Sequence, residues 1–187
     1  MVKPPHPPER CSAAATGGFT LAEMLIVVLI VGILAVVAVP TLGVGRKKLE
    51  VAGQEVGNAL RFALNESRRI GGFVLVDART SPGRVLILNS DVTAVRGSDV
   101  VDPLTKRAMD IDVAASAFSA GVSVNPKFVA AGSSYPQLLI GPGPAFWAAQ
   151  GSVVMGTLQP GSGIDLTLGS TTVTVAFDSV TGRVVVP

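Results

Sequence analysis

The stretch Gly17-Gly18-Phe19-Thr20-Leu21-Ala22-Glu23 opens the most apolar part of the sequence. From Phe19 to Val39 the only charged side chain is that of Glu23. A helix over this run would be about 31 Å long at about 1.5 Å per residue, enough to cross the hydrocarbon core of a bilayer. An acid inside such a run is costly and usually marks a function. The sequence therefore predicts a transmembrane helix with a carboxylate that requires a partner.

Residues 1–18 are predicted to be a leader that is removed. They are polar and rich in proline, and they lack the apolar core that precedes the cut in an ordinary signal peptide. Cutting after the small residue Gly18 would create a free amine at Phe19, one helical turn before the carboxylate of Glu23. The alternative is a signal anchor that is never cut, which leaves the position of Gly18 unexplained.

The residues Gly18-Phe19-Thr20-Leu21-Ala22-Glu23, the apolar run and Pro40 resemble the N-terminus of type IV pilins and type II secretion pseudopilins. The resemblance implies that a prepilin peptidase cuts between Gly18 and Phe19 and methylates the new amine of Phe19. It assigns Glu23 to assembly, where its carboxylate neutralises the amine of a neighbouring subunit. It also implies that Pro40 breaks or loosens the helix.

The resemblance implies an α+β, pilin-like fold, in which one long N-terminal helix packs on an antiparallel β-sheet head. The expected parts are the leader 1–18, a transmembrane half of the helix 19–39, an amphipathic half 40–72, and a β-rich head 73–187. From Leu49 to Ile70 apolar residues recur every three or four positions, and Gly71-Gly72 supplies a stop. Gly53 and Gly57 have G-x-x-x-G spacing, but they lie outside the apolar run, so the membrane dimerisation motif does not apply.

Beyond Gly72, short β-rich runs alternate with Gly, Pro, Ser and Asn breaks. The predicted strands are Phe73–Asp77, Arg84–Leu88, Val92–Val95, Gly121–Val124, Gln137–Ile140, Ser152–Met155, Gly163–Leu168, Thr171–Phe177 and Val184–Val186, and Val113–Phe118 is ambiguous. Two segments, 59–76 and 175–184, look like the corresponding parts of H-type minor pseudopilins.

The composition argues against catalysis. Cys11 and His6 are the only residues of their types and both lie in the predicted leader. The mature chain would then lack the commonest general base and the commonest metal ligand, and no nucleophile has an obvious base. We therefore expect no enzymatic activity, no cofactor and no metal. The 15 basic and 13 acidic side chains nearly cancel, which excludes a strongly basic nucleic-acid binder by bulk charge.

Three weaker patterns leave alternatives open. The aspartates Asp99, Asp102, Asp110 and Asp112 suggest a calcium loop, but their spacing matches no template. The aromatic residues Tyr135, Phe146 and Trp147 either contact a partner or cap the core. Binding of DNA would need a patch built from the head's cations: Arg79, Arg84, Arg96, Lys106, Arg107, Lys127 and Arg183.

The resemblance implies a minor pseudopilin, a structural subunit of the periplasmic pseudopilus of a type II secretion system. The alternative is a minor type IV pilin that acts in pilus initiation, adhesion or DNA uptake. The expected partners are other pilins or pseudopilins, the prepilin peptidase, an inner-membrane assembly platform and lipid. The expected location is the inner membrane, crossed once, with the head in the periplasm. The basic triplet Arg46-Lys47-Lys48 contacts lipid headgroups or forms a solvated helix turn.

Overall fold

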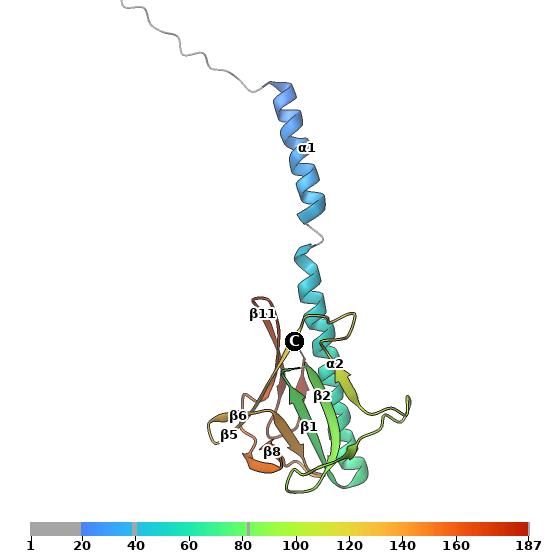
Figure 1. Ribbon diagram of the computed structural model, residues 1–187. Helices are drawn as coiled ribbons and strands as arrows, with labels where there is room; N and C mark the ends of the chain where they lie inside the picture. The colour runs from blue at the N-terminus through green and yellow to red at the C-terminus, as the bar shows by residue number, and fades with distance from the viewer. Residues whose placement is uncertain (1–19, 39–40, 82, 187) are drawn as a thin grey trace, which may run out of the picture. The chain divides into compact units, whose positions relative to one another are not determined.

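The computed structural model describes residues 20–38, 41–81 and 83–186 (Figure 1). They form two helices, α1 (Leu21–Ala38) and α2 (Thr41–Ile70). The twelve strands are β1 (Phe73–Arg79), β2 (Arg84–Ser90), β3 (Arg96–Asp99), β4 (Asp110–Asp112), β5 (Ser123–Ala130), β6 (Ser133–Tyr135), β7 (Gln137–Ile140), β8 (Phe146–Gln150), β9 (Val153–Thr157), β10 (Gly163–Leu168), β11 (Thr171–Phe177) and β12 (Val184–Val185).

The chain divides into two compact units, Met1–Leu42 and Gly43–Pro187. The predicted fold class, one long N-terminal helix packed on a sheet, is wrong. The helical part consists of two separate elements, and more of the described residues lie in strands than in helices. The fold is therefore mostly β, with antiparallel sheets.

The predicted single pass through the inner membrane is also wrong. Among the described residues, no helix combines the length and the apolar character that a membrane span needs. Helix α1 has 18 residues, or about 27 Å of length, whereas a span needs about 20 residues. Phe19, Val39 and Pro40 lie outside the described residues.

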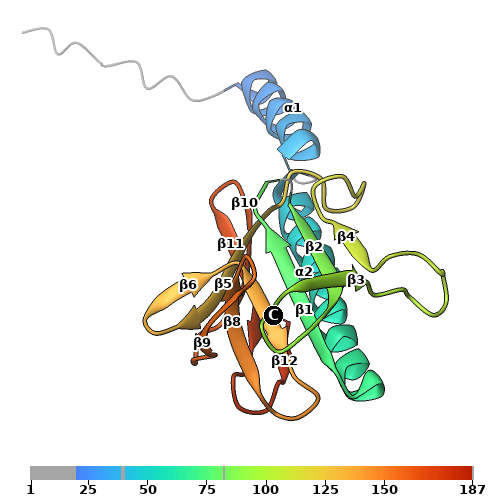
Figure 2. The same cartoon turned by 60° about the horizontal axis from the view of Figure 1, so that its bottom comes forward.

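The second unit contains two sheets. The larger has the strand order β3-β2-β1-β7-β8-β9, with β4 also paired to β2, and the smaller has the order β12-β11-β10-β5-β6. Every strand pair is antiparallel. Figure 2 shows the two sheets together with α2, which runs alongside β1 and β2.

Successive side chains along a strand point to opposite faces of the larger sheet, and both faces carry buried apolar residues. Val74, Val76 and Ala78 of β1 point into the main core, which α2 shares. On the opposite face Leu75 belongs to a second cluster, together with Leu139 and half-buried aromatic neighbours. The larger sheet is therefore covered on both faces, although the second cluster is small.

Helix α2 is amphipathic, as its periodicity predicts. Leu49, Ala52, Val56 and Leu60 have no exposed surface, and all four lie in the main core with residues of both sheets. The helix ends at Ile70, and Gly71 has a φ of 63°, a left-handed conformation typical of glycine after a helix. The predicted stripe and stop are confirmed.

Two of the glycines of α2, Gly53 and Gly57, leave room for the C-terminal segment to pack against the helix. A Cβ atom on Gly57 would lie 2.4 Å from Val186 Cγ2, and one on Gly53 would lie 3.3 Å from Val186 Cγ1. Arg61 secures the same segment, because its Nη2 donates a hydrogen bond to the carbonyl oxygen of Val184 at 3.3 Å. The G-x-x-x-G spacing thus serves packing within the head.

Several predicted strands are confirmed. The first hairpin forms from β1 and β2, and the second from β10 and β11, with bounds that match or extend the prediction. The prediction for Val92–Val95 is wrong: Asp91 Oδ1 accepts hydrogen bonds from the backbone N–H groups of Thr93 and Val95, which folds the segment into a turn. The ambiguous segment Val113–Phe118 is also irregular.

Candidate functional site

The N-terminus of α1 is closed by a reciprocal cap. The backbone N–H and the hydroxyl of Thr20 both donate hydrogen bonds to Glu23 Oε2, each at 2.9 Å. In return the backbone N–H of Glu23 donates to Thr20 Oγ1 at 3.3 Å. This is the capping-box arrangement, which satisfies donors that have no partner within the helix. In this structure Glu23 therefore has a local partner that the sequence analysis did not anticipate.

Every described side chain of α1 from Leu21 to Leu34 is exposed. The exposed fraction is 83% for Leu21 and 59% for Leu29, and both are large apolar residues. The helix is apolar all round, with Glu23 as its only charged residue. A helix of that kind is normally buried, so α1 presents a surface that other apolar groups must cover.

The structure leaves three predicted site residues undescribed. Gly18 and Phe19 at the predicted cut, and Pro40 at the predicted helix break, all lie outside the described residues. Glu23 is thus the one assembly residue whose surroundings are visible.

The four aspartates of the calcium alternative do not come together. Asp110 pairs with Arg84, and Asp112 Oδ1 accepts a hydrogen bond from the backbone N–H of Ala115 at 2.9 Å. Asp102 closes a separate turn, described below, and Asp99 is exposed on β3. Within residues 20–38, 41–81 and 83–186, no group of three or more acidic, His or Cys side chains is placed to hold a metal.

Three of the seven candidate DNA-binding cations are paired with carboxylates. Arg79 Nε donates to Asp77 Oδ2 at 2.9 Å, and Arg96 donates to the same oxygen. Gln137 Nε2 donates to Asp77 Oδ1 at 3.0 Å, so the carboxylate, which is only 2% exposed, has partners on both oxygens. Arg84 is similarly bound to Asp110. The sequence analysis missed this network, although an Asp between apolar strand residues was the available signal.

The aromatic residues contribute mainly to cores. Phe146 is buried and meets Phe177 edge to face, with ring centroids 5.0 Å apart. Trp147 is half-buried against Phe73, at 6.0 Å between centroids. Tyr135 is half-buried against the main core. Of the two alternatives, capping of the core is confirmed for Phe146.

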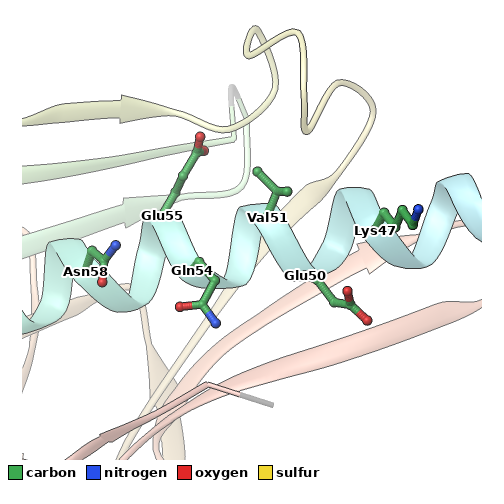
Figure 3. Close-up of a pocket in the computed structure, with 6 residues that line it drawn as sticks. All are labelled: Lys47, Glu50, Val51, Gln54, Glu55 and Asn58. Carbon is green, nitrogen blue, oxygen red and sulfur yellow. The ribbon is translucent and has the colours of Figure 1, made fainter.

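Two surface features that the sequence analysis did not identify lie on one side of the second unit. A groove of about 560 Å³ runs along α2 and is lined by Lys47, Glu50, Val51, Gln54, Glu55 and Asn58 (Figure 3). A second groove, of about 470 Å³, separates the C-terminal half of α2 from the turn after β3, and its lining includes Phe62, Val101 and Lys106.

Two carboxylates of α2 have opposite electrostatic environments. Hydrogen bonds from Arg69 lower the pKa of Glu66, against a smaller opposing effect of burial, and the charge of Arg69 lowers it further. Burial alone raises the pKa of Glu55. None of the ion pairs formed by the described residues includes Glu55. Glu55 is therefore a partly desolvated carboxylate that no cation of the described residues pairs with.

Comparisons with protein-family models, with curated proteins and with solved structures find no match for this chain.

Proposed function

We propose that the chain is a non-enzymatic structural subunit of a helical filament of the pilin and pseudopilin type, as a minor pseudopilin of a type II secretion system. The observation that carries the proposal is α1, an apolar helix with every described side chain from Leu21 to Leu34 exposed. Packing of α1 helices from several subunits would remove this surface from water. At about 25 cal/mol per Å² of apolar area, such burial is the main driving force for assembly.

One feature of the sequence and one of the structure support the proposal. The resemblance around Gly18, Phe19 and Glu23 assigns processing and assembly to this end of the chain. The second unit is a self-contained core with α2 as its helical layer, which suits a head that projects from a filament. The prepilin peptidase and the other subunits of the filament are the partners that follow.

The alternative within the same class is a minor type IV pilin. The exposed α1 supports both forms equally, since both assemble through an apolar helix. DNA uptake gains little support, because Arg79, Arg84 and Arg96 are already bound to carboxylates.

Processing is the first test. The full chain should be produced in cells with an active prepilin peptidase, and the N-terminus of the product determined by mass spectrometry. The proposal predicts an N-methylated Phe19. An intact Met1 terminus would contradict it.

Assembly is the second test, and the cap of α1 supplies its control. Glu23→Gln removes the charge and should strongly reduce the fraction of chain in sedimentable filaments. Thr20→Ala breaks the capping box but keeps the carboxylate, so its effect should be smaller. Asp99→Asn removes an exposed acid on β3, outside both helices, and should assemble like the parent. A loss for Thr20→Ala at least as large as that for Glu23→Gln would show that Glu23 acts only as a cap, because Gln can still accept the hydrogen bonds of Thr20.

A further inference from the structure

The turn between Val101 and Ala108 presents an apolar residue to solvent. Leu104, near its centre, is 90% exposed. The turn is held in shape by Asp102: Oδ1 accepts a hydrogen bond from the backbone N–H of Leu104 at 2.9 Å, and Oδ2 accepts one from the hydroxyl of Thr105 at 2.8 Å. Because its backbone is fixed in this way, we call residues 102–107 the tip.

Cations flank the exposed leucine. Lys106 and Arg107 follow it after Thr105, and no ion pair of the described residues includes either of them. Lys106 has a φ of 57°, which is uncommon for a residue with a side chain and costs energy. The backbone N–H of Lys106 donates to the carbonyl oxygen of Asp102 at 2.9 Å, which keeps this conformation. The tip thus combines an exposed apolar side chain with two cations that form no ion pair among the described residues, although the charge of Lys106 also acts on Asp102 in the same turn.

The groove along α2 has the complementary character. Figure 3 shows Val51 and Glu55 projecting to one side of the helix and Glu50 and Gln54 to the other, and all four side chains line the groove. Val51 gives the groove an apolar surface that is 38% exposed. Glu55 gives it a carboxylate that forms no ion pair within the described part of the chain, while Glu50 pairs with Arg46. Lys47 lies at one end of the groove, away from Glu55.

The tip of a chain cannot fill that chain's own groove. Lys106 lines the second groove of α2 together with Phe62. Phe62 lies about three helical turns beyond Val51, so both residues are on the same side of α2 but roughly 16 Å apart. The tip therefore lies next to the C-terminal half of α2, on the same side of the helix as Val51.

We propose that the tip of one copy docks into the α2 groove of a second copy. Leu104 would cover Val51, and Lys106 or Arg107 would neutralise Glu55, whose desolvation is otherwise uncompensated. The contact joins two different surfaces, so each copy keeps a free tip at one end and a free groove at the other. Contacts of this kind produce open chains of subunits when the rotation between copies does not close.

This inference rests on the proposed function, because it specifies how the second units of neighbouring filament subunits meet. It names a contact that is separate from the packing of α1. The two ideas can consequently fail independently, and the experiment below separates them.

Disulfide trapping of the full chain tests the contact. In a Cys11→Ser background, a copy with Leu104→Cys is mixed with a copy with Val51→Cys and oxidised. The control pairs Val180→Cys with Val51→Cys. Val180 is 72% exposed, against 90% for Leu104, and lies on another turn closed by an aspartate, Asp178, so it is a control of the same turn type that is also largely exposed.

The proposal predicts a yield of mixed disulfide at least about fivefold above the control, since complementary charge favours the specific encounter. A chain that carries both Leu104→Cys and Val51→Cys should give a ladder of covalent multimers. A yield equal to the control, or a product dominated by the Leu104→Cys homodimer, would overturn the proposal.

Reversing the charges on the tip and on the groove provides a second test of the contact. Lys106→Glu with Arg107→Glu in the Leu104→Cys partner should lower the yield, and so should Glu55→Lys in the Val51→Cys partner. Combining them should restore part of the yield, because the charges are again opposite. Unchanged yields in both reversed pairs, or no recovery in the combination, would contradict the contact.

Filament formation, followed by electron microscopy on the same samples, separates the two ideas. Filaments without the specific disulfide would refute the docking of the tip and leave the proposed function standing. The disulfide ladder without filaments would support the docking and refute assembly through α1.

Discussion

Helices α1 and α2 come from neighbouring parts of the chain but differ in what covers them. Helix α2 carries apolar residues on one side, and that side is buried in the core of its own unit. Helix α1 is apolar on every side, and its described side chains remain exposed. The number of apolar residues alone therefore does not decide whether a helix joins the core of its own chain. The distribution of the apolar residues around the helix decides this, because sheets on one side can cover an apolar stripe but cannot cover a helix that is apolar on every side.

The largest expected effect comes from placing a charge on each helix. Leu60→Asp buries an unpaired carboxylate in the core and should destabilise the second unit by more than about 3 kcal/mol. Leu29→Asp changes an exposed residue of α1 and should leave the unfolding midpoint of the second unit unchanged. Urea denaturation followed by circular dichroism, with the near-ultraviolet signal of Trp147 reporting on the second unit, measures both. Similar losses of stability in the two variants would contradict the difference between the two helices.

Glycine substitutions in the two helices test the same difference, with smaller expected changes in stability. Gly57→Ala places a methyl group 2.4 Å from Val186 Cγ2 and should cost about 1–2 kcal/mol. Adding Val186→Ala should recover part of that loss, because it removes the atom that clashes. A Cβ atom on Gly32 of α1 meets nothing within 4 Å, so Gly32→Ala should be neutral or favour helix α1 by up to about 1 kcal/mol. Gly57→Ala that melts above the parent would show that the C-terminal segment does not pack on α2.

The smallest effects are electrostatic and lie within α2. The folded-state pKa of Glu66 is below its unfolded value, so its charge contributes stability above the unfolded pKa and that stability is lost as pH falls through the folded pKa. The folded-state pKa of Glu55 is raised, so its charge lowers stability at neutral pH and the penalty disappears as pH falls to the unfolded pKa.

Removing each of these two charges should therefore change the stability of the protein in opposite directions. Glu66→Gln should destabilise the protein at about pH 7, and Glu55→Gln should stabilise it, with both differences shrinking near pH 3 as carboxylates become protonated. Denaturant unfolding at the two pH values measures the effects. A loss of stability in Glu55→Gln at neutral pH would mean that Glu55 has a partner within its own chain.

Local patterns in the sequence predict the pieces of the fold better than their arrangement. The stripe from Leu49 to Leu60 identifies the buried side of α2, and the break at Gly71 gives its end, since both depend on neighbouring residues. The hairpin of β10 and β11 is equally local. The expected continuity from α1 to α2 came instead from the family resemblance, and the two helices are separate elements.

Long-range contacts explain part of what the sequence analysis missed, and local hydrogen bonds of side chains explain the rest. Gly53 and Gly57 look like a helix-pairing motif, but their partner is Val186, far away in the sequence. Val92–Val95 has the composition of a strand, yet Asp91 captures its backbone N–H groups. β5 runs through Pro126, which is compatible with a strand because β6 pairs only with Phe128–Ala130 and leaves that edge open. Thr20 and Glu23 have the spacing of a capping box, a local signal that the sequence analysis did not use, whereas the α2 groove had no such signal.

The central claim is that other copies cover α1 whereas its own chain covers α2. The most direct test is the rate of maleimide labelling at Leu29→Cys on α1, in a Cys11→Ser background, compared between dispersed and assembled protein. Val180→Cys, on an exposed turn of the second unit, is the control. The account predicts that assembly strongly slows labelling at Leu29→Cys and leaves Val180→Cys nearly unchanged. Equal labelling of Leu29→Cys in the two states would contradict it.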